Sequence, residues 1–165
     1  MTQNFLPHEE LARSRVLPEW IDSNGHMNVA YYVLAFDQAL DRFCDHVGIG
    51  WSSIKERNES VFVLETHVTY QQEVMVDDPL RITLQVLDFD EKRVHFFMRM
   101  FHAEQGYLAA TSEQIMLHVG LEQRRAAPMP VSSRQILAKI FEFHRTLPRP
   151  PEAGRVIGIR RKPER

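Results

Sequence analysis

Hydrophobic residues between positions 29 and 47 recur at intervals of three and four, the spacing of one face of an α-helix. The recurring positions are Tyr32, Phe36, Leu40, Phe43 and Val47. Asn28 is placed to cap the first turn, and Gly48 is placed to end the last one. The pattern therefore predicts a helix over 29–47. Its first half, 29–36, is apolar on every side, which predicts burial all round.

The segments that follow the helix have the pattern of β-strands separated by turns. Strands are predicted over 61–72, 80–86, 94–103 and 107–119, with a shorter one over 11–18 ahead of the helix. No helix lies between the four long strands, so we expect three or four consecutive strands to form an antiparallel meander. Strands of this length curl strongly. The chain therefore predicts an α+β fold in which one long antiparallel sheet wraps around one central helix.

The last part of the chain has a different pattern. Ser132 or Ser133 is placed to cap a short amphipathic helix after a proline-rich linker at 128–130. The helical pattern includes Ile136, Leu137, Ile140 and Phe141. We therefore divide the chain into one domain over 1–130, a C-terminal helix over 131–147 and a basic, proline-rich tail over 148–165. The tail has almost no apolar pattern, which predicts a solvated end.

Composition and charge narrow the function. The chain has 165 residues, 44% of them hydrophobic and 25% charged, which is typical of one globular domain. A formal net charge of -2 argues against nucleic-acid or membrane partners. The single cysteine, Cys44, forms no internal disulfide, so we expect a reducing, cytoplasmic location. The eight histidines lack the spacing of a preformed metal site, so we expect no metal.

The polar segment between Asp22 and Asn28 is the strongest candidate for chemistry. It combines a carboxylate, an imidazole, two carboxamides and a glycine directly before an apolar helix. The start of a helix offers unpaired N–H groups and a partial positive charge, which suit a carbonyl oxygen that becomes negative during attack. Asp22 can act as a nucleophile or as the base for a water molecule. The alternative is that Asp22 and Asn28 only form the turn and the cap, and that His26 only packs.

The stretch over 20–32 resembles the opening of hotdog-fold acyl-CoA thioesterases of the 4-hydroxybenzoyl-CoA thioesterase type. The motif positions of that family fall on Asp22, Gly25, His26, Asn28, Tyr32, Phe36 and Asp37. The resemblance implies an acyl-CoA substrate and no cofactor, because coenzyme A is part of the substrate. It also implies a homodimer with one continuous sheet, or a homotetramer built from two such dimers, with active sites at the dimer interface.

The resemblance also implies residue roles. Asp22 takes the catalytic position, and His26 and Asn28 position the loop or the water. Backbone N–H groups around 28–30 polarise the thioester carbonyl. The expected substrate-binding residues are Trp20, Gly25, Val29, Ala30, Tyr32, Glu65 and His67. Val29 stands where some bacterial relatives carry a second catalytic histidine, which is a departure from the family pattern.

Glu65 and His67 are expected to reach the partner subunit's active site. They are two residues apart on a predicted strand, so they share one face of the sheet. In a hotdog dimer this strand lies at the subunit interface, next to the partner's loop. The alternative is that both are ordinary polar positions of a half-solvated strand.

Three functions remain open at this point. The first is hydrolysis of a small acyl-CoA thioester, and the segment over 24–28 is similar to thioesterases found with carnitine and betaine catabolism, so betainyl-CoA is a candidate. Its trimethylammonium group suits aromatic faces such as Trp20 and Tyr32. The second is a hotdog enoyl-CoA hydratase, but only three residues separate Asp22 from His26, where those enzymes have four. The third is a non-catalytic acyl-CoA-binding protein, for which the chain has no evident output module.

Overall fold

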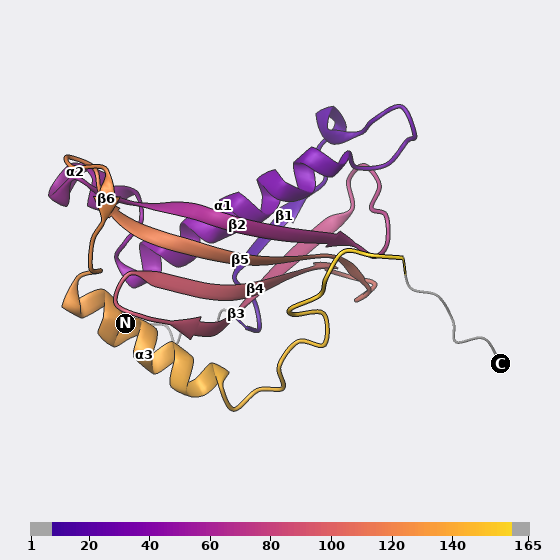
Figure 1. Cartoon of the computed structure of the whole chain (residues 1–165). Coiled ribbons are helices and arrows are strands. Elements are labelled where there is room, and N and C mark those ends of the chain that lie inside the picture. Colours follow the sequence, from indigo (N-terminus) through magenta and orange to yellow (C-terminus); the bar gives the residue numbers. More distant parts are fainter. Residues whose placement is uncertain (1–7, 160–165) are drawn as a thin grey trace.

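The computed structural model describes residues 8–159 and contains a six-stranded antiparallel sheet that curves around one long helix (Figure 1). The strands are β1 (Ala12–Arg15), β2 (Glu59–Tyr70), β3 (Pro79–Phe89), β4 (Arg93–His102), β5 (Leu108–Gly120) and β6 (Arg125–Ala126). The helices are η1 (Pro18–Trp20), α1 (Val29–Val47), α2 (Trp51–Arg57) and α3 (Val131–His144). This arrangement confirms the expected α+β fold. Residues 160–165, the end of the predicted basic tail, lie outside the described residues.

Helix α1 begins and ends where its sequence predicts. The side chain of Asn28 accepts a hydrogen bond from the Ala30 N–H (3.0 Å), which satisfies one of the free donors of the first turn. Gly48 ends the helix in the left-handed conformation (φ 78°), which glycine adopts without steric cost. The sheet-facing side of α1 is fully buried at Phe36 and Phe43. Each such side chain contributes about 1.5–3 kcal/mol when it leaves water, so this face fixes the helix on the sheet.

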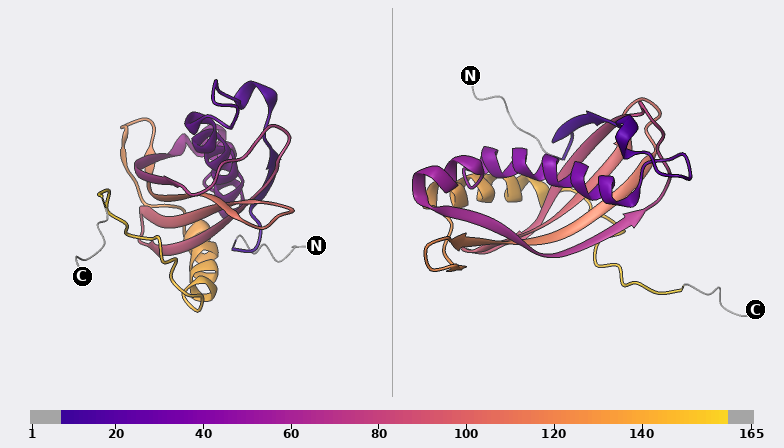
Figure 2. Two further views of the ribbon diagram at one scale, coloured as in Figure 1. Left: turned by 90° about the vertical axis from the view of Figure 1, so that its right-hand side faces the viewer. Right: turned by 90° about the horizontal axis from the view of Figure 1, so that it is seen from above.

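The prediction that α1 is buried all round its first half is wrong for the isolated chain. Val29, Val33 and Leu34 are 57%, 43% and 38% exposed. The sheet covers α1 from one side only, as the end-on view shows (Figure 2). The sheet of the same chain therefore leaves an apolar strip of α1 open.

The strand order confirms a meander of three consecutive strands and excludes a fourth. It is β1-β3-β4-β5-β2, so only β3, β4 and β5 are consecutive neighbours. β2 pairs with β5 and not with β3, because the loop over 71–78 carries the chain from one side of the sheet to the other. Val74 in this loop is fully buried, and its carbonyl accepts the Met27 N–H (3.0 Å), so the loop is fixed beneath the start of α1. β2 consequently lies at the edge of the sheet.

The first turn of α3 also differs from the sequence-based expectation. The helix begins at Val131 with Pro130 at the N-cap, so neither Ser132 nor Ser133 caps it. Ser133 is instead buried, and its hydroxyl donates to the Gly48 carbonyl at the end of α1 (3.4 Å). Proline fixes the backbone just ahead of a helix, which makes a serine cap unnecessary here. Helix α2, which was not predicted, is a seven-residue segment without a side-chain cap.

Helix α3 covers the part of β3 that β1 leaves unpaired. β1 pairs with β3 only over 79–82, and the Val86 N–H farther along β3 donates to Nδ1 of His144 (2.8 Å). His144 is 1% exposed. Its burial, followed by the nearby His8 ring, lowers the pKa of His144 to about 4. The neutral imidazole therefore acts as the acceptor for an otherwise unpaired strand N–H.

We expect the free energy of unfolding to fall as the pH decreases from about 6.5 to about 4. The pKa of His144 is lower in the folded chain than in the unfolded chain, so the unfolded chain binds more protons across this window. In His144→Gln the amide oxygen can still accept the Val86 N–H, but the residue no longer titrates. Urea unfolding at several pH values should show a smaller decrease for the variant than for the wild type. Identical pH profiles would assign the decrease to other groups.

The first part of the C-terminal tail is not a free end. We call residues 148–159 the C-terminal arm, which crosses the outer face of the sheet, the face away from α1. Three contacts fix it to successive strands: Gln85 Nε2 to the Pro148 carbonyl (3.3 Å), Arg99 to Glu152 (3.6 Å), and the Gly154 N–H to Glu113 Oε2 (2.6 Å). The solvated end predicted for the whole tail is therefore wrong for 148–154.

No described helix is long and apolar enough to cross a membrane.

Candidate active site

Residues 20–28 form a tight hairpin that ends at the first turn of α1. Three contacts close it: the bridge between Ile21 and Met27, the Asp22 N–H to the His26 carbonyl (3.1 Å), and the Asn28 N–H to the Trp20 carbonyl (2.9 Å). Gly25 turns the chain with φ +86°, a conformation that other residues adopt only with strain. The hairpin therefore fixes the Asp22 backbone directly ahead of the helix N-terminus.

The Asp22 carboxylate has one occupied and one open oxygen. Oδ1 accepts the Asn24 N–H (2.8 Å), which closes the turn. Oδ2 accepts no hydrogen bond from the residues that the structure describes. The side chain is half-buried. One oxygen thus shapes the loop, while the other can receive a proton from water or attack a carbonyl carbon.

Fewer backbone N–H groups are free to bind a ligand at the start of α1 than the sequence predicts. The Asn28 N–H donates to Trp20, and the Ala30 N–H donates to the Asn28 side chain. The Val29 N–H has no acceptor among residues 8–159. Its position on the first turn also places it in the positive field of the helix dipole. Of the three amides expected around 28–30, Val29 therefore offers the available donor for a carbonyl oxygen.

A cavity of about 190 Å³ opens beside this donor. It is lined by His26, Met27, Val29, Tyr32, Tyr70, Gln71, Gln72 and Glu73. The rings of Tyr32 and Tyr70 meet edge to face, with centroids 5.2 Å apart and an interplanar angle of 81°. Burial raises the pKa of the Tyr32 hydroxyl, so this side of the cavity is neutral at physiological pH.

The cavity contains three of the predicted site residues, His26, Val29 and Tyr32. Tyr70 and the segment over 71–73 were not predicted, because they belong to the far end of β2 and follow no motif. The only signal for Tyr70 in the sequence is an aromatic residue at the end of a strand. Its hydroxyl donates to the Val29 carbonyl (3.4 Å), which links the end of β2 to the start of α1.

Trp20 is a core residue at the start of the hairpin and does not line the cavity. It is 5% exposed, and its ring stacks on Tyr31 with centroids 5.6 Å apart and an angle of 12°. His26 is half-buried, and its Nδ1 lies 3.3 Å from the Met27 carbonyl. The structure therefore places His26 at the cavity and Trp20 in the core beneath it.

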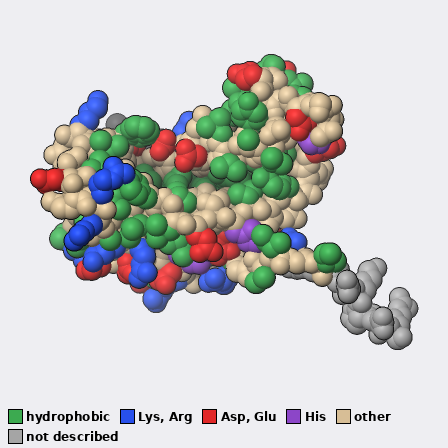
Figure 3. All heavy atoms as spheres, turned by 45° about the horizontal axis from the view of Figure 1, so that its top comes forward, with side chains coloured by type: hydrophobic (Ala, Val, Ile, Leu, Met, Phe, Trp, Pro, Cys, Tyr) green, Lys and Arg blue, Asp and Glu red, His purple; other side chains and the backbone are tan. Residues whose placement is uncertain are grey.

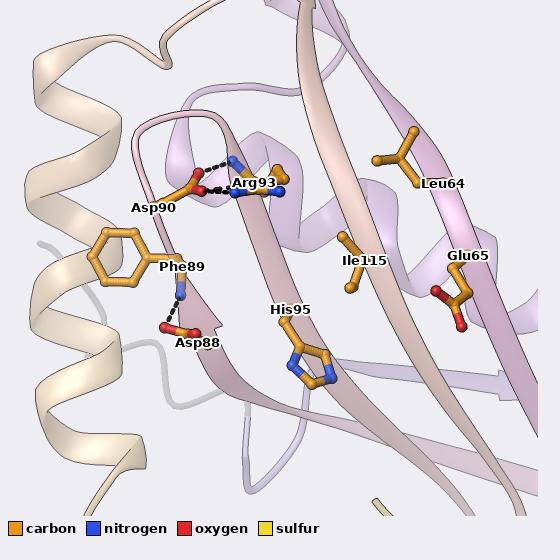
Figure 4. Close-up of a pocket in the computed structure, with 8 residues that line it drawn as sticks. All are labelled: Leu64, Glu65, Asp88, Phe89, Asp90, Arg93, His95 and Ile115. Atoms are coloured by element: carbon orange, nitrogen blue, oxygen red, sulfur yellow. Dashed lines mark hydrogen bonds and ion pairs between the residues drawn. The ribbon is translucent and has the colours of Figure 1, made fainter. Parts of the chain in front are cut away.

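Glu65 and His67 share one face of β2, as predicted, but that face is the outer one. Their partners on β5 are Ile115 and Glu113, and an irregularity at Leu64 shifts the register just before them. Two cavities of about 300 and 320 Å³ lie along this outer face, and Glu65 lines both. Figure 4 shows the residues that line the first of them. Both are larger than the cavity at α1, but the sheet separates them from Asp22. Within one subunit Glu65 and His67 do not meet Asp22, and their role at a partner's site stays a prediction.

Comparisons with known proteins identify similar chains. The sequence profile described as the thioesterase-like superfamily matches residues 16–140. The chain is 37% identical over 144 residues to the betainyl-CoA thioesterase of Pseudomonas aeruginosa, and the match covers 87% of this chain and 91% of that protein. It is also 36% identical over 151 residues to the L-carnitine dehydrogenase/betainyl-CoA thioesterase of Rhizobium meliloti. That match covers 92% of this chain but only 30% of the two-part enzyme.

Solved structures share the architecture. The structure of a Staphylococcus aureus protein in complex with CoA superposes with a TM-score of 0.86 at 30% sequence identity, and the match covers 96% of this chain and all of that chain. The 1,4-dihydroxy-2-naphthoyl-CoA thioesterase of Synechocystis gives a TM-score of 0.70 at 14% identity over 78% of this chain and 95% of that chain. The second likeness concerns the fold alone.

Proposed function

The chain belongs to the thioesterase-like superfamily and is a thioester hydrolase of the hotdog fold, and we propose that its substrate is betainyl-CoA. Two groups of the hairpin and the helix start support the proposal for the site, although Asp22 itself is not among the residues that line the cavity at Val29. The Asp22 carboxylate has an open oxygen, and the Val29 N–H at the start of α1 is without an acceptor in the described chain. These are the two groups that hydrolysis of a thioester requires, a base or nucleophile and an oxyanion donor.

In the proposed reaction the thioester oxygen accepts a hydrogen bond from the Val29 N–H, which stabilises the negative charge that develops there. Asp22 either takes a proton from the attacking water or attacks the carbonyl carbon itself. With Asp22 as the base, the carbon–oxygen bond to water forms, the carbon–sulfur bond breaks, and the CoA thiolate takes up the proton that Asp22 received. With Asp22 as the nucleophile, the carbon–sulfur bond breaks as a mixed anhydride forms, and water then hydrolyses the anhydride, which releases the acid, regenerates Asp22 and supplies the proton for the thiolate. His26 and Asn28 hold the loop, since Asn28 caps the helix and the His26 carbonyl binds the Asp22 N–H.

The cavity beside Val29 suits a small cationic acyl group. Its walls include the Tyr32 and Tyr70 rings, and Glu73 adds a carboxylate. Aromatic faces and carboxylates both attract a trimethylammonium group. A volume of about 190 Å³ also favours a short acyl group over a long chain. The relatives named as betainyl-CoA thioesterases support the same choice.

The substrate is tested by comparing kcat/KM for betainyl-CoA and tert-butylacetyl-CoA, measured by thiol release. The two acyl groups have the same shape and differ only in the charge of the central atom. We expect betainyl-CoA to be preferred at least about tenfold, which corresponds to roughly 1.4 kcal/mol of cation recognition. Equal values would reject the cationic substrate but not the hydrolase. Hydration of crotonyl-CoA without hydrolysis of any thioester would favour the hydratase instead.

We also propose that the chain forms a homodimer through β2. This twelve-residue strand pairs with β5 on one side, and no described strand covers its other edge. Hydrophobic side chains gather on the face that carries α1 and β2 (Figure 3). On these two elements Val33, Val63 and Tyr70 are 43%, 43% and 48% exposed. A free strand edge beside exposed apolar residues suits a second copy that continues the sheet. Light scattering measures the mass and distinguishes this dimer from a homotetramer.

We also propose that the protein is located in the reducing cytoplasm. Cys44 is a free thiol that is 2% exposed, and it packs against Met116 in the core. Burial raises the pKa of this thiol, so it is unreactive and has no part in the proposed chemistry.

A further inference from the structure

The C-terminal arm runs across the strands toward the edge of the sheet that the proposed dimer uses. Its three contacts, to Gln85, Arg99 and Glu113, lie on β3, β4 and β5 in that order. β2 is the next strand in the sheet. Both views in Figure 2 show the arm leaving the sheet on the side where β2 lies. The arm therefore points toward the place where a second copy would continue the sheet.

The part of the arm beyond Gly154 carries an unusual amount of exposed apolar surface. Val156, Ile157 and Ile159 are 85%, 86% and 87% exposed, whereas the next most exposed large hydrophobic residue, Trp51, is 65% exposed among those the structure describes. Figure 3 shows hydrophobic side chains along the segment that stands away from the body. Scattered single hydrophobic residues on a surface are normal, but three within four residues indicate a surface that is covered by another molecule.

The first of the two outer-face cavities, which Leu64 and Glu65 of β2 line, has apolar walls that suit the exposed aliphatic residues of the arm. Its apolar walls are Leu64, Phe89 and Ile115 (Figure 4). Leu64 is 56% exposed and lies at the irregular position of the edge strand, so this cavity begins at the dimer edge. Its volume is about 300 Å³, which is enough for aliphatic side chains.

The charges of cavity and arm are complementary. Glu65 and Asp88 line the cavity and make no ion pair with the described residues, whereas Asp90 pairs with Arg93 (2.6 Å). The arm carries Arg155, and the sequence continues with Arg160-Arg161-Lys162. A basic apolar segment therefore fits an acidic apolar cavity.

We propose that in the dimer each C-terminal arm crosses the paired β2 strands and packs its aliphatic residues into the outer-face cavity of the partner, beside Leu64. The inference rests on the dimer proposed above. Five extended residues, 155–159, span about 16 Å, and neighbouring strands lie about 4.8 Å apart, so the arm is long enough to cross from one β2 to the other. In its own subunit the arm borders the second cavity only up to Val156, and Ile157 and Ile159 beyond it are 86% and 87% exposed.

Disulfide trapping between different chains tests the crossing. Ile157→Cys and Leu64→Cys are made as separate proteins of different mass, mixed and oxidised mildly, and Cys44 does not compete because it is buried. We expect a disulfide-linked heterodimer. The matched control pairs Ile157→Cys with Val131→Cys, an equally accessible position on α3 that is 61% exposed, and no linkage is expected. If the double variant I157C/L64C forms its disulfide only within one chain, the arm closes on its own subunit and the proposal is wrong.

A truncation measures what the arm contributes. Removing residues 155–165 is expected to raise the dimer dissociation constant at least about tenfold, because three aliphatic side chains are no longer there to leave water when the dimer forms, while the circular dichroism spectrum stays unchanged. The two proposals fail differently. A monomeric wild-type protein overturns the dimer and the arm crossing together. A dimeric wild type, with an unchanged dissociation constant after truncation and no trapped heterodimer, overturns only the arm crossing.

Discussion

Replacing Asp22 with Asn is expected to lower kcat on the preferred thioester at least ~10²-fold while the fold is kept. The amide oxygen of Asn can still accept the Asn24 N–H, so the turn closes as before. What is lost is the negative oxygen that takes a proton from water or attacks the thioester. The Val29 N–H remains in place, so binding of the carbonyl should change little and KM should stay within a few-fold.

The measurement is steady-state thiol release, with thermal unfolding as the check on the fold. Glu19→Gln is the matched control, since it removes an exposed carboxylate from the neighbouring η1 without touching the hairpin. It should leave kcat unchanged. Full activity in Asp22→Asn would remove Asp22 from the mechanism and would leave its carboxylate only the structural role of closing the turn.

Local signals explain which parts of the fold could be predicted. Helix α1 has an asparagine that caps its first turn and a glycine that ends its last one, and both act within a few residues of chain. The strands of the sheet similarly follow from alternation and turn residues. Helix caps, turns and strand alternation depend only on residues that are close in sequence, so the sequence alone is enough to predict them.

The parts that could not be predicted depend on residues far apart in sequence. The position of β2 beside β5 is set by the loop over 71–78 and its buried Val74, which no local pattern reveals. Likewise, the apolar first half of α1 predicts burial all round, but the structure shows that the chain's own sheet covers the helix from one side only. Val29 and Val33 remain exposed, which is the behaviour of a surface meant for a second copy.

The candidate site also contains residues that a local motif predicts and residues whose position depends on the fold. The motif locates Asp22, His26 and Val29 because they are consecutive parts of one hairpin and helix start. Tyr70 reaches the same cavity from the end of β2, and its role depends on how the sheet curls. For Glu65 the sequence predicts only part of the position. Alternation places Glu65 and His67 on the same face of β2, but the pairing with β5 decides that this face is the outer one.

A charge at Val63 is expected to convert the proposed dimer into a folded, weakly active monomer. Val63 is 43% exposed in the single chain, and it pairs with the buried Met116, so its side chain lies on the inner face at the free edge. In a dimer that continues the sheet, Val63→Lys would bury an ammonium group without a partner, which costs several kcal/mol. We expect the dissociation constant to rise at least ~10²-fold.

Activity should fall in parallel with the dimer fraction, because Tyr70, the last residue of the edge strand β2, lines the cavity at Val29 and the family resemblance implies a site at the interface. Sedimentation and thiol release at increasing protein concentration give the two curves. If the site needs both subunits, high concentrations of Val63→Lys restore activity together with the dimer, by mass action. Val131→Lys, on the exposed side of α3, controls for the added charge and should remain dimeric. Full activity of a Val63→Lys monomer would mean that one chain holds the whole active site, and the exposed strip on α1 would then need another explanation.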